Sequence, residues 1–205
     1  MLQLPNGRVL FSDWSTQLHA YTPTGSPLAD GKPTIHSITW NGDGSLHLTG
    51  TLLNGISSGA SYGDDLQMDS NYPLVRLSRG ANGYYARTHH WSSTSVATGS
   101  QVLSTEFYLP AGLTPGSYSL VVVANGLPSN PVSFYGPVWV DFNYGGFFEF
   151  GTFPLPYKTL GSGVGAVAAG SAIMLKPSAS TELMTISKPM TIHTPGGPAR
   201  IGVGH

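Results

Sequence analysis

Apolar and polar residues alternate in short runs along most of the chain, and turn-forming residues separate these runs. About seven such runs follow one another between residues 31 and 136. Alternation with a period of two predicts β-strands that bury one face and expose the other. The runs are PTIHSITW, SLHLTGTLL, YPLVRLSR, YYARTHHW, STEFYLP, GSYSLVVVAN and PVSFYG.

Residues 1–30 predict a short hairpin. The turn at Pro5–Gly7 precedes a strand at Arg8–Phe11, and the segment QLHAYTPTGSP supplies the second strand. A two-stranded hairpin alone is marginally stable in water. We therefore expect this part to pack against the rest of the chain.

Residues 137–205 have a different pattern, in which small residues are followed by short apolar runs about ten residues apart. Pro and Gly separate these runs, which is typical of short strands stacked in successive coils. Val164–Ala169 predicts a short helix, which Gly163 and Gly165 weaken by about 1 kcal/mol each. The four apolar runs are Ala172–Leu175, Met184–Ile186, Met190–Ile192 and Ala199–Ile201.

The composition supports an all-β protein. Only 9% of the residues are charged, against roughly 25% in ordinary soluble domains, and the chain contains 27 Gly and 16 Pro. Low charge together with abundant turn residues favours many short strands. We predict an N-terminal hairpin (1–30), an immunoglobulin-like β-sandwich (31–136) and a C-terminal segment of stacked strands (137–205).

Charge and residue content exclude several functions. The net charge is −1 and no Lys/Arg-rich run is present, so we expect no nucleic-acid partner. No apolar run reaches the ~20 residues needed to span a bilayer. The absence of cysteine removes disulfides, thiolate zinc sites and cysteine nucleophiles. The start MLQLPNGRVLF lacks the basic and apolar regions of a signal peptide, so none is expected in this chain.

The stretch YYARTHHWSS, residues 84–93, holds the densest candidate chemistry. Neighbouring imidazoles at His89 and His90 suggest a metal site, with His19, His36 and His47 as further ligands. Strand alternation opposes this hypothesis, because it places His89 and His90 on opposite faces. A third interpretation is a ligand-binding surface, in which aromatic rings stack on sugars. Its residues are Tyr84, Tyr85 and Trp91.

The acidic residues give weaker signals. Asp64, Asp65 and Asp69 lie close together in SYGDDLQMDSNYP, and their oxygen atoms suggest a calcium site. A turn held by Asx hydrogen bonds explains the same residues, and adjacent carboxylates do not have the separation that glycoside cleavage needs. The isolated residues Glu106, Glu149 and Glu182 are assigned no role.

Residues 1–136 resemble the end of galactose-oxidase or kelch-type proteins. The segments that carry the resemblance are LPNGRVLFSD, KPTIHSI, YPLVRLSR and FYLPAGLTPGSYSLVVVANGLPSNPVSF, in this order. The resemblance implies a last propeller strand followed by an immunoglobulin-like early-set domain. In galactose oxidase that domain sends one histidine to copper, so the resemblance implies copper at His89 or His90. The propeller that supplies the other copper ligands in that family is missing here.

Residues 137–205 resemble the N-terminal part of right-handed parallel β-helix proteins of the pectin-lyase-like type. The segments VWVDFNYGG, GTFPLPYKTL and AIMLKPSASTELMTISKPMTIHTPGGPARIG carry this resemblance. It implies a cap helix and the first coils of a truncated β-helix, without the later coils that hold catalytic groups in that family. Because a short solenoid leaves an open edge, we expect homo-oligomers that associate through this edge.

The leading functional expectation is a non-catalytic extracellular or cell-surface β module of bacterial type. It would bind a polysaccharide or a surface protein, or act as a scaffold. No motif requires a cofactor, and copper and calcium are the metals that the residues suggest. The alternatives are an enzyme and a self-assembling structural protein. The enzyme would be a copper-dependent oxidase using His89 and His90, or a hydrolase with its site at the domain junction.

Overall fold

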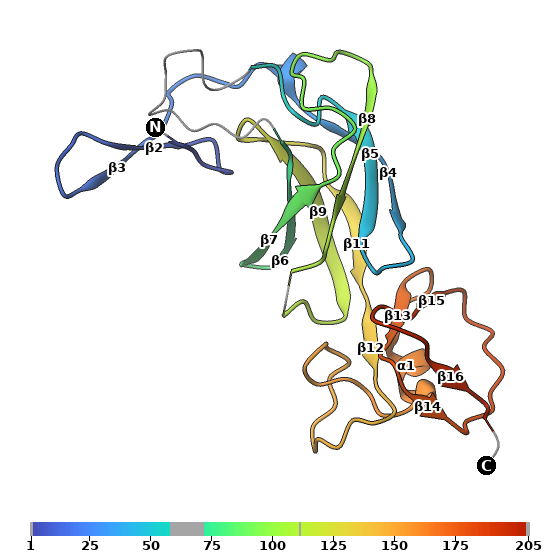
Figure 1. Ribbon diagram of the computed structural model, residues 1–205. Helices are drawn as coiled ribbons and strands as arrows, with labels where there is room; N and C mark the ends of the chain where they lie inside the picture. The colour runs from blue at the N-terminus through green and yellow to red at the C-terminus, as the bar shows by residue number, and fades with distance from the viewer. Residues whose placement is uncertain (1, 58–71, 111, 204–205) are drawn as a thin grey trace.

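The computed structural model describes residues 2–57, 72–110 and 112–203, and β-strands make up most of its regular structure. The prediction of a mainly β protein is therefore confirmed. A small N-terminal sheet and a C-terminal region lie at opposite ends of a larger central sheet (Figure 1). No helix among the described residues is long and apolar enough to cross a membrane.

The N-terminal sheet has three antiparallel strands, β1 (Leu2–Gln3), β2 (Val9–Ser12) and β3 (Leu18–Tyr21). Strands β2 and β3 form the expected hairpin, and β1 adds a short third strand. At the turn after β9, Gln3 Nε2 donates a hydrogen bond to the Asn125 carbonyl oxygen at 2.6 Å. This hydrogen bond ties the start of the chain to the central region.

The central region is an antiparallel sheet of eight strands, with the order β10-β9-β6-β7-β8-β5-β4 and β11 paired with β9. Alternating residues form these strands and turn-forming residues lie between them, as the sequence predicts. The strands are β4 (Thr34–Trp40), β5 (Leu46–Thr51), β6 (Leu74–Arg79), β7 (Asn82–His89), β8 (Val102–Phe107), β9 (Gly116–Ala124), β10 (Leu127–Pro128) and β11 (Val132–Gly136).

One apolar core fills the interior of this sheet, because its two halves face each other. Leu48 of β5 and Phe107 of β8 come from one half, and Leu77 of β6 and Leu120 of β9 come from the other; all four are fully buried. Strand β7 joins the halves. It pairs with β6 from Asn82 to Arg87, and with β8 at its last two residues, Thr88 and His89. The outward-facing side chains at the end of β7 therefore lie next to those of β8.

The C-terminal region is built from parallel strands. Strands β12 (Val138–Val140), β13 (Ala172–Leu175) and β15 (Thr191–His193) form one sheet, and β14 (Ala179–Ser180) pairs with β16 (Arg200–Ile201). Pro137 alone separates β11 from β12. The chain therefore passes from the antiparallel sheet into the parallel sheet without a loop.

Two sequence expectations for this region are corrected. Met184–Ile186 was expected to form a strand, but no strand lies there. The helix α1 spans Leu160–Ala166, earlier than the expected Val164–Ala169. The Thr159 hydroxyl accepts a hydrogen bond from the Ser162 amide, so the helix begins at this cap.

Candidate functional site

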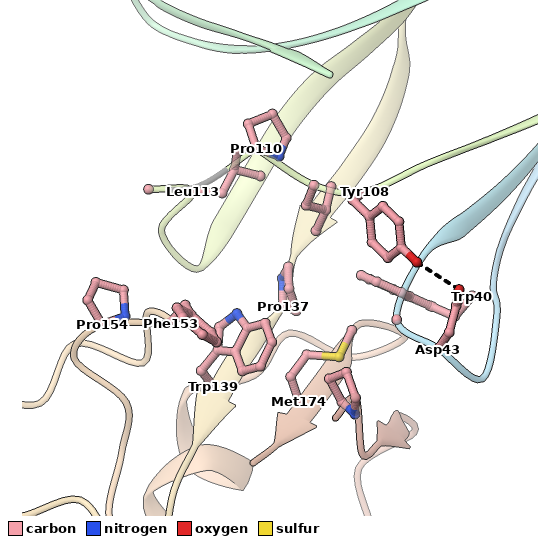
Figure 2. A pocket seen from close by; sticks show the side chains of 14 residues that line it. Trp40, Asp43, Tyr108, Pro110, Leu113, Pro137, Trp139, Phe153, Pro154 and Met174 are labelled. Atoms are coloured by element: carbon pink, nitrogen blue, oxygen red, sulfur yellow. Dashed lines mark hydrogen bonds between the residues drawn. The ribbon is translucent and has the colours of Figure 1, made fainter. Parts of the chain in front are cut away.

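The junction between the central and C-terminal regions holds an apolar cleft of about 530 Å³. We call it the junction cleft. Figure 2 shows side chains from both regions around it. The central region contributes the end of β4, the β4–β5 turn and the segment after β8, and the C-terminal region contributes β12, β13 and the loop before α1. Its aromatic residues are Trp40, Tyr108, Trp139 and Phe153.

Strand register builds the C-terminal wall of the junction cleft. Trp139 of β12 pairs with Met174 of β13, which pairs with His193 of β15, so the three residues form one row across the parallel sheet. In β12 and β13 the residues beside them point to the other face and belong to the core of this region. The row therefore faces the central region, where the Trp40 ring lies 5.4 Å from the His193 ring. Burial lowers the pKa of His193.

Aromatic contacts fix the two tryptophan rings. The Trp40 ring lies 6.4 Å from the Phe134 ring of the central core, so Trp40 contacts both regions. The Trp139 ring meets the Phe153 ring edge-on, with centroids 4.9 Å apart. Edge-on pairs of this kind are favourable beyond the area that they bury. Contacts within the chain therefore hold both tryptophan rings in place at the junction cleft.

The polar rim of the junction cleft is a hydrogen-bonded pair, Asp43 and Tyr108 (Figure 2). The Tyr108 hydroxyl donates to Asp43 Oδ2 at 2.9 Å. The amide and hydroxyl of Ser45 both donate to Asp43 Oδ1, at 2.9 and 2.7 Å. These hydrogen bonds, with those from Ser45 contributing most, lower the pKa of Asp43 to about 2, and the bond to Asp43 raises the pKa of Tyr108. The rim therefore holds an ionised acceptor at ordinary pH.

The β4–β5 turn reaches the C-terminal region at Gly44. Its φ of +85° is unfavourable for other residues, and a Cβ atom there would lie 2.9 Å from Pro195 Cβ. Glycine is thus needed both for the turn and for the close approach to the other region. This contact closes one side of the junction cleft.

A second group of candidate side chains lies on the outer face of the central sheet. His47 of β5 lies opposite Glu106 of β8, and Glu106 lies opposite His89 of β7. His47 Nδ1 lies 3.6 Å from Glu106 Oε1. His89 Nδ1 lies 3.9 Å from Glu106 Oε2. His90 Nδ1 hydrogen-bonds Oε2 at 2.7 Å. We call these four residues the histidine–glutamate cluster.

The expectation that His89 and His90 face opposite sides is wrong. Strand β7 ends at His89, and His90 has a φ of 51°, which is outside the strand conformation. Its ring therefore turns back toward His89, with ring centroids 4.6 Å apart. The hydrogen bond from His90 lowers the pKa of Glu106. The ligand atoms of His89, His90 and Glu106 all lie within 4.8 Å of one another, so these residues can hold a metal ion.

Tyr108 belongs to both sites. Its ring stacks on the His89 ring with centroids 5.2 Å apart, while its hydroxyl bonds Asp43 at the rim of the junction cleft. The histidine–glutamate cluster and the junction cleft are therefore neighbours that share one side chain.

The structure does not bring Tyr84, Tyr85 and Trp91 together. Tyr84 packs against the central core, with its ring 6.1 Å from the Tyr118 ring. Tyr85 points outward, because alternate residues of β7 face opposite sides. Trp91 follows the strand, and its ring stacks on Tyr72 at 4.8 Å. The calcium candidates Asp64, Asp65 and Asp69 lie outside the described residues.

All three isolated glutamates have partners that the sequence did not reveal. Glu106 lies at the centre of the histidine–glutamate cluster. Glu149 accepts a hydrogen bond from the Lys158 amide at 2.9 Å. Glu182 accepts from the amides of Leu160 and Gly161, at 2.7 and 3.2 Å, at the start of α1. A carboxylate opposite a histidine on a neighbouring strand would indicate such a cluster, but only once the strand pairing is known.

Comparison of the sequence with models of protein families and with curated proteins gives no match.

Proposed function

We propose that this protein is a non-catalytic extracellular β module that binds a neutral polysaccharide in the junction cleft. The observation that carries the proposal is the lining of this cleft: four aromatic side chains with an ionised carboxylate at the rim. The extracellular location rests on the two family resemblances alone.

The chemistry of the junction cleft suits a sugar ring. The C–H faces of a sugar are apolar and stack on aromatic rings, while its hydroxyl groups need polar partners. Trp139 and Phe153 supply the stacking surface, and Asp43 supplies the acceptor. The volume of about 530 Å³ lies within the range of small-molecule sites, roughly 300–1,000 Å³.

The charge of the rim favours neutral over acidic sugars. Asp43 is ionised above a pH of about 2, and a uronic acid beside it would meet like-charge repulsion. The same ionisation argues against the hydrolase alternative. Asp43 is the only carboxylate among the described lining residues of the junction cleft, and an acid catalyst must carry a proton at working pH.

Beyond the mainly β architecture, we propose a specific fold for each of the two larger regions. We assign the central region to an immunoglobulin-like early-set sandwich and residues 137–205 to the first coils of a parallel β-helix. Two facing halves around one core support the first assignment. The parallel pairing of β12, β13 and β15 beside a short helix supports the second.

Affinity electrophoresis tests the proposed function. The full chain is run through gels that contain neutral polysaccharides, namely glucans, xylans, mannans and galactans, or acidic pectin and alginate. We expect at least one neutral polysaccharide to retard the protein and the acidic ones to have little effect. Retardation should be lost in Trp139→Ala and kept in Trp91→Ala, a matched tryptophan outside the junction cleft.

Two results would contradict the proposal. The first is migration that no neutral polysaccharide changes. The second is retardation that Trp91→Ala abolishes and Trp139→Ala leaves intact, because it would move the site to the end of β7. Circular dichroism of both variants confirms that they fold.

Self-association is a second candidate function, and exposed apolar residues favour it. In the C-terminal region Leu183 is 87% exposed and Ile192 is 40% exposed. Exposed apolar patches mark surfaces that bind partners. Homo-oligomers that form through the open edge of the C-terminal segment remain a prediction. Sedimentation velocity over a range of protein concentrations tests it. A single monomeric species at the highest concentration would rule it out.

A further inference from the structure

We propose that His47, His89, His90 and Glu106 bind one divalent transition-metal ion of the zinc type. This metal site lies beside the junction cleft and contacts it through Tyr108, but it does not depend on the proposed function. The four residues come from three neighbouring strands and the residue after β7. The ion would therefore crosslink β5, β7 and β8 on the outer face of the central sheet.

The spacing of the candidate ligand atoms fits a metal ion. Zinc binds nitrogen and oxygen ligands at about 2.0–2.2 Å, so tetrahedral ligands lie roughly 3.4 Å from one another. The three Nδ1 atoms lie 2.7, 3.6 and 3.9 Å from the nearest Glu106 oxygen. The ligand atoms of His89, His90 and Glu106 also lie within 4.8 Å of one another, and His47 does not belong to that group. A rotation of the half-buried His47 side chain would bring its Nδ1 atom to the ion as a fourth ligand.

His89 supplies the second observation, because neither of its ring nitrogens has a protein partner among the described residues. Nδ1 lies 3.9 Å from Glu106 Oε2, which is beyond hydrogen-bonding distance. Nε2 is buried and has no hydrogen-bond partner. Buried polar atoms are nearly always satisfied. A metal ion bound at Nδ1 or at Nε2 would give the imidazole a partner at that nitrogen. Tyr108 holds the ring in place by stacking.

The donor set selects the class of ion. Three imidazoles and one carboxylate suit zinc and its neighbours, whereas calcium requires six to eight oxygen ligands. With His47 as the fourth ligand, the protein would fill the tetrahedral shell and leave no open position, which is typical of structural sites. The geometry therefore points to a structural crosslink and not to the oxidase that copper at His89 or His90 would imply.

Isothermal titration of the tag-free full chain with zinc chloride, after removal of metals by chelation, tests this inference. We expect about one ion per chain. Glu106→Gln should weaken zinc binding by roughly 10–100-fold or more, because losing even an outer-shell partner of a metal ligand typically costs that much affinity. His36→Gln is the matched control, since His36 is an exposed histidine on β4 outside the cluster. It should leave the affinity unchanged.

Thermal unfolding supplies a second readout that separates this site from scattered surface binding. Zinc should raise the melting temperature of the wild type and of His36→Gln, but not that of Glu106→Gln, and calcium should have no effect. Glu106→Gln keeps the shape of an outer-face side chain, so it is expected to fold. The inference is overturned if zinc binding is not saturable, or if His36→Gln weakens it as much as Glu106→Gln does.

Discussion

The central and C-terminal regions are both β-structures, but different forces hold them together. In the central region, fully buried apolar side chains from both halves of the sheet form one core, which includes Leu77, Phe107 and Leu120. The C-terminal region has a smaller core, and charged side chains tie its segments together. Glu182 accepts hydrogen bonds from the first amides of α1, and Lys188 Nζ donates to three carbonyl oxygens near its end.

This difference follows from how the strands are connected. Three antiparallel pairs of the central region, β4–β5, β6–β7 and β9–β10, are joined by turns, so alternation in the sequence is enough to align their apolar faces. Parallel strands need longer connections, and here those connections hold few buried apolar residues. Polar contacts at the ends of α1 replace them, with an anionic group at the N-terminus and a cation at the C-terminus, as the helix dipole favours.

The largest expected effect is on the central core. Leu120→Ala removes a fully buried side chain, so we expect it to lower the free energy of unfolding by about 2–5 kcal/mol. Urea unfolding followed by circular dichroism measures this loss. A loss below about 1 kcal/mol would show that the two halves do not share a tightly packed core.

A charged contact of the C-terminal region gives the next largest effect. Glu182→Gln replaces one of the two oxygens that accept the α1 amides, so we expect a loss of about 1.5–3 kcal/mol. Leu183→Ala is the control, because its side chain is 87% exposed and should change stability by less than about 0.5 kcal/mol. Equal effects of the two variants in thermal unfolding would refute the role of Glu182.

The contact between the two regions can be tested at Gly44. Gly44→Ala places a Cβ atom 2.9 Å from Pro195 at a φ of +85°, so we expect it to cost about 1–3 kcal/mol and to distort the junction cleft. Gly42→Ala is the matched control in the same turn, because no heavy atom lies within 4 Å of its Cβ position. Denaturant unfolding of both variants should separate them, and equal stabilities would contradict the close approach.

The smallest effect is a pH dependence from Asp43. Its folded-state pKa of about 2 is below the usual value of 3.8, so its ionisation stabilises the fold fully above about pH 4. This stabilisation is lost as the pH falls toward about 2, because the carboxylate is then protonated. The difference in melting temperature between wild type and Asp43→Asn should therefore shrink between pH 4 and pH 2. A difference that stays constant over this range would contradict the lowered pKa.

The sequence predicted most of the elements that are determined by residues close together along the chain, above all the strands of the central region. The alternating runs of the central region coincide with its strands, because each run sets its own buried face. The prediction failed where the conformation departs from the regular pattern. His90 leaves the strand conformation after β7, so alternation assigned its ring to the wrong face. Met184–Ile186 is apolar but has no strand partner, since β14 pairs with β16 instead.

The sequence indicated His89 and His90 as a candidate metal site, but it could not show how either site is assembled, for a different reason. The junction cleft joins Trp40, Tyr108, Trp139 and Phe153, which are far apart along the chain. Glu106 meets three histidines only because β5 and β7 both pair with β8. Pairing between distant strands is set by the whole core, and no local pattern encodes it.

The central claim is that the junction cleft is the binding surface, and one measurement tests it most directly. Isothermal titration with an oligosaccharide of the retarding neutral polysaccharide should compare Phe153→Ala with Phe147→Ala. Both phenylalanines are more than half exposed, at 57% and 89%, but only Phe153 lines the junction cleft. We expect Phe153→Ala to weaken binding at least about tenfold, which corresponds to about 1.4 kcal/mol, and Phe147→Ala to bind as the wild type does. Equal affinities for the two variants would place the saccharide outside the junction cleft and contradict the proposed function.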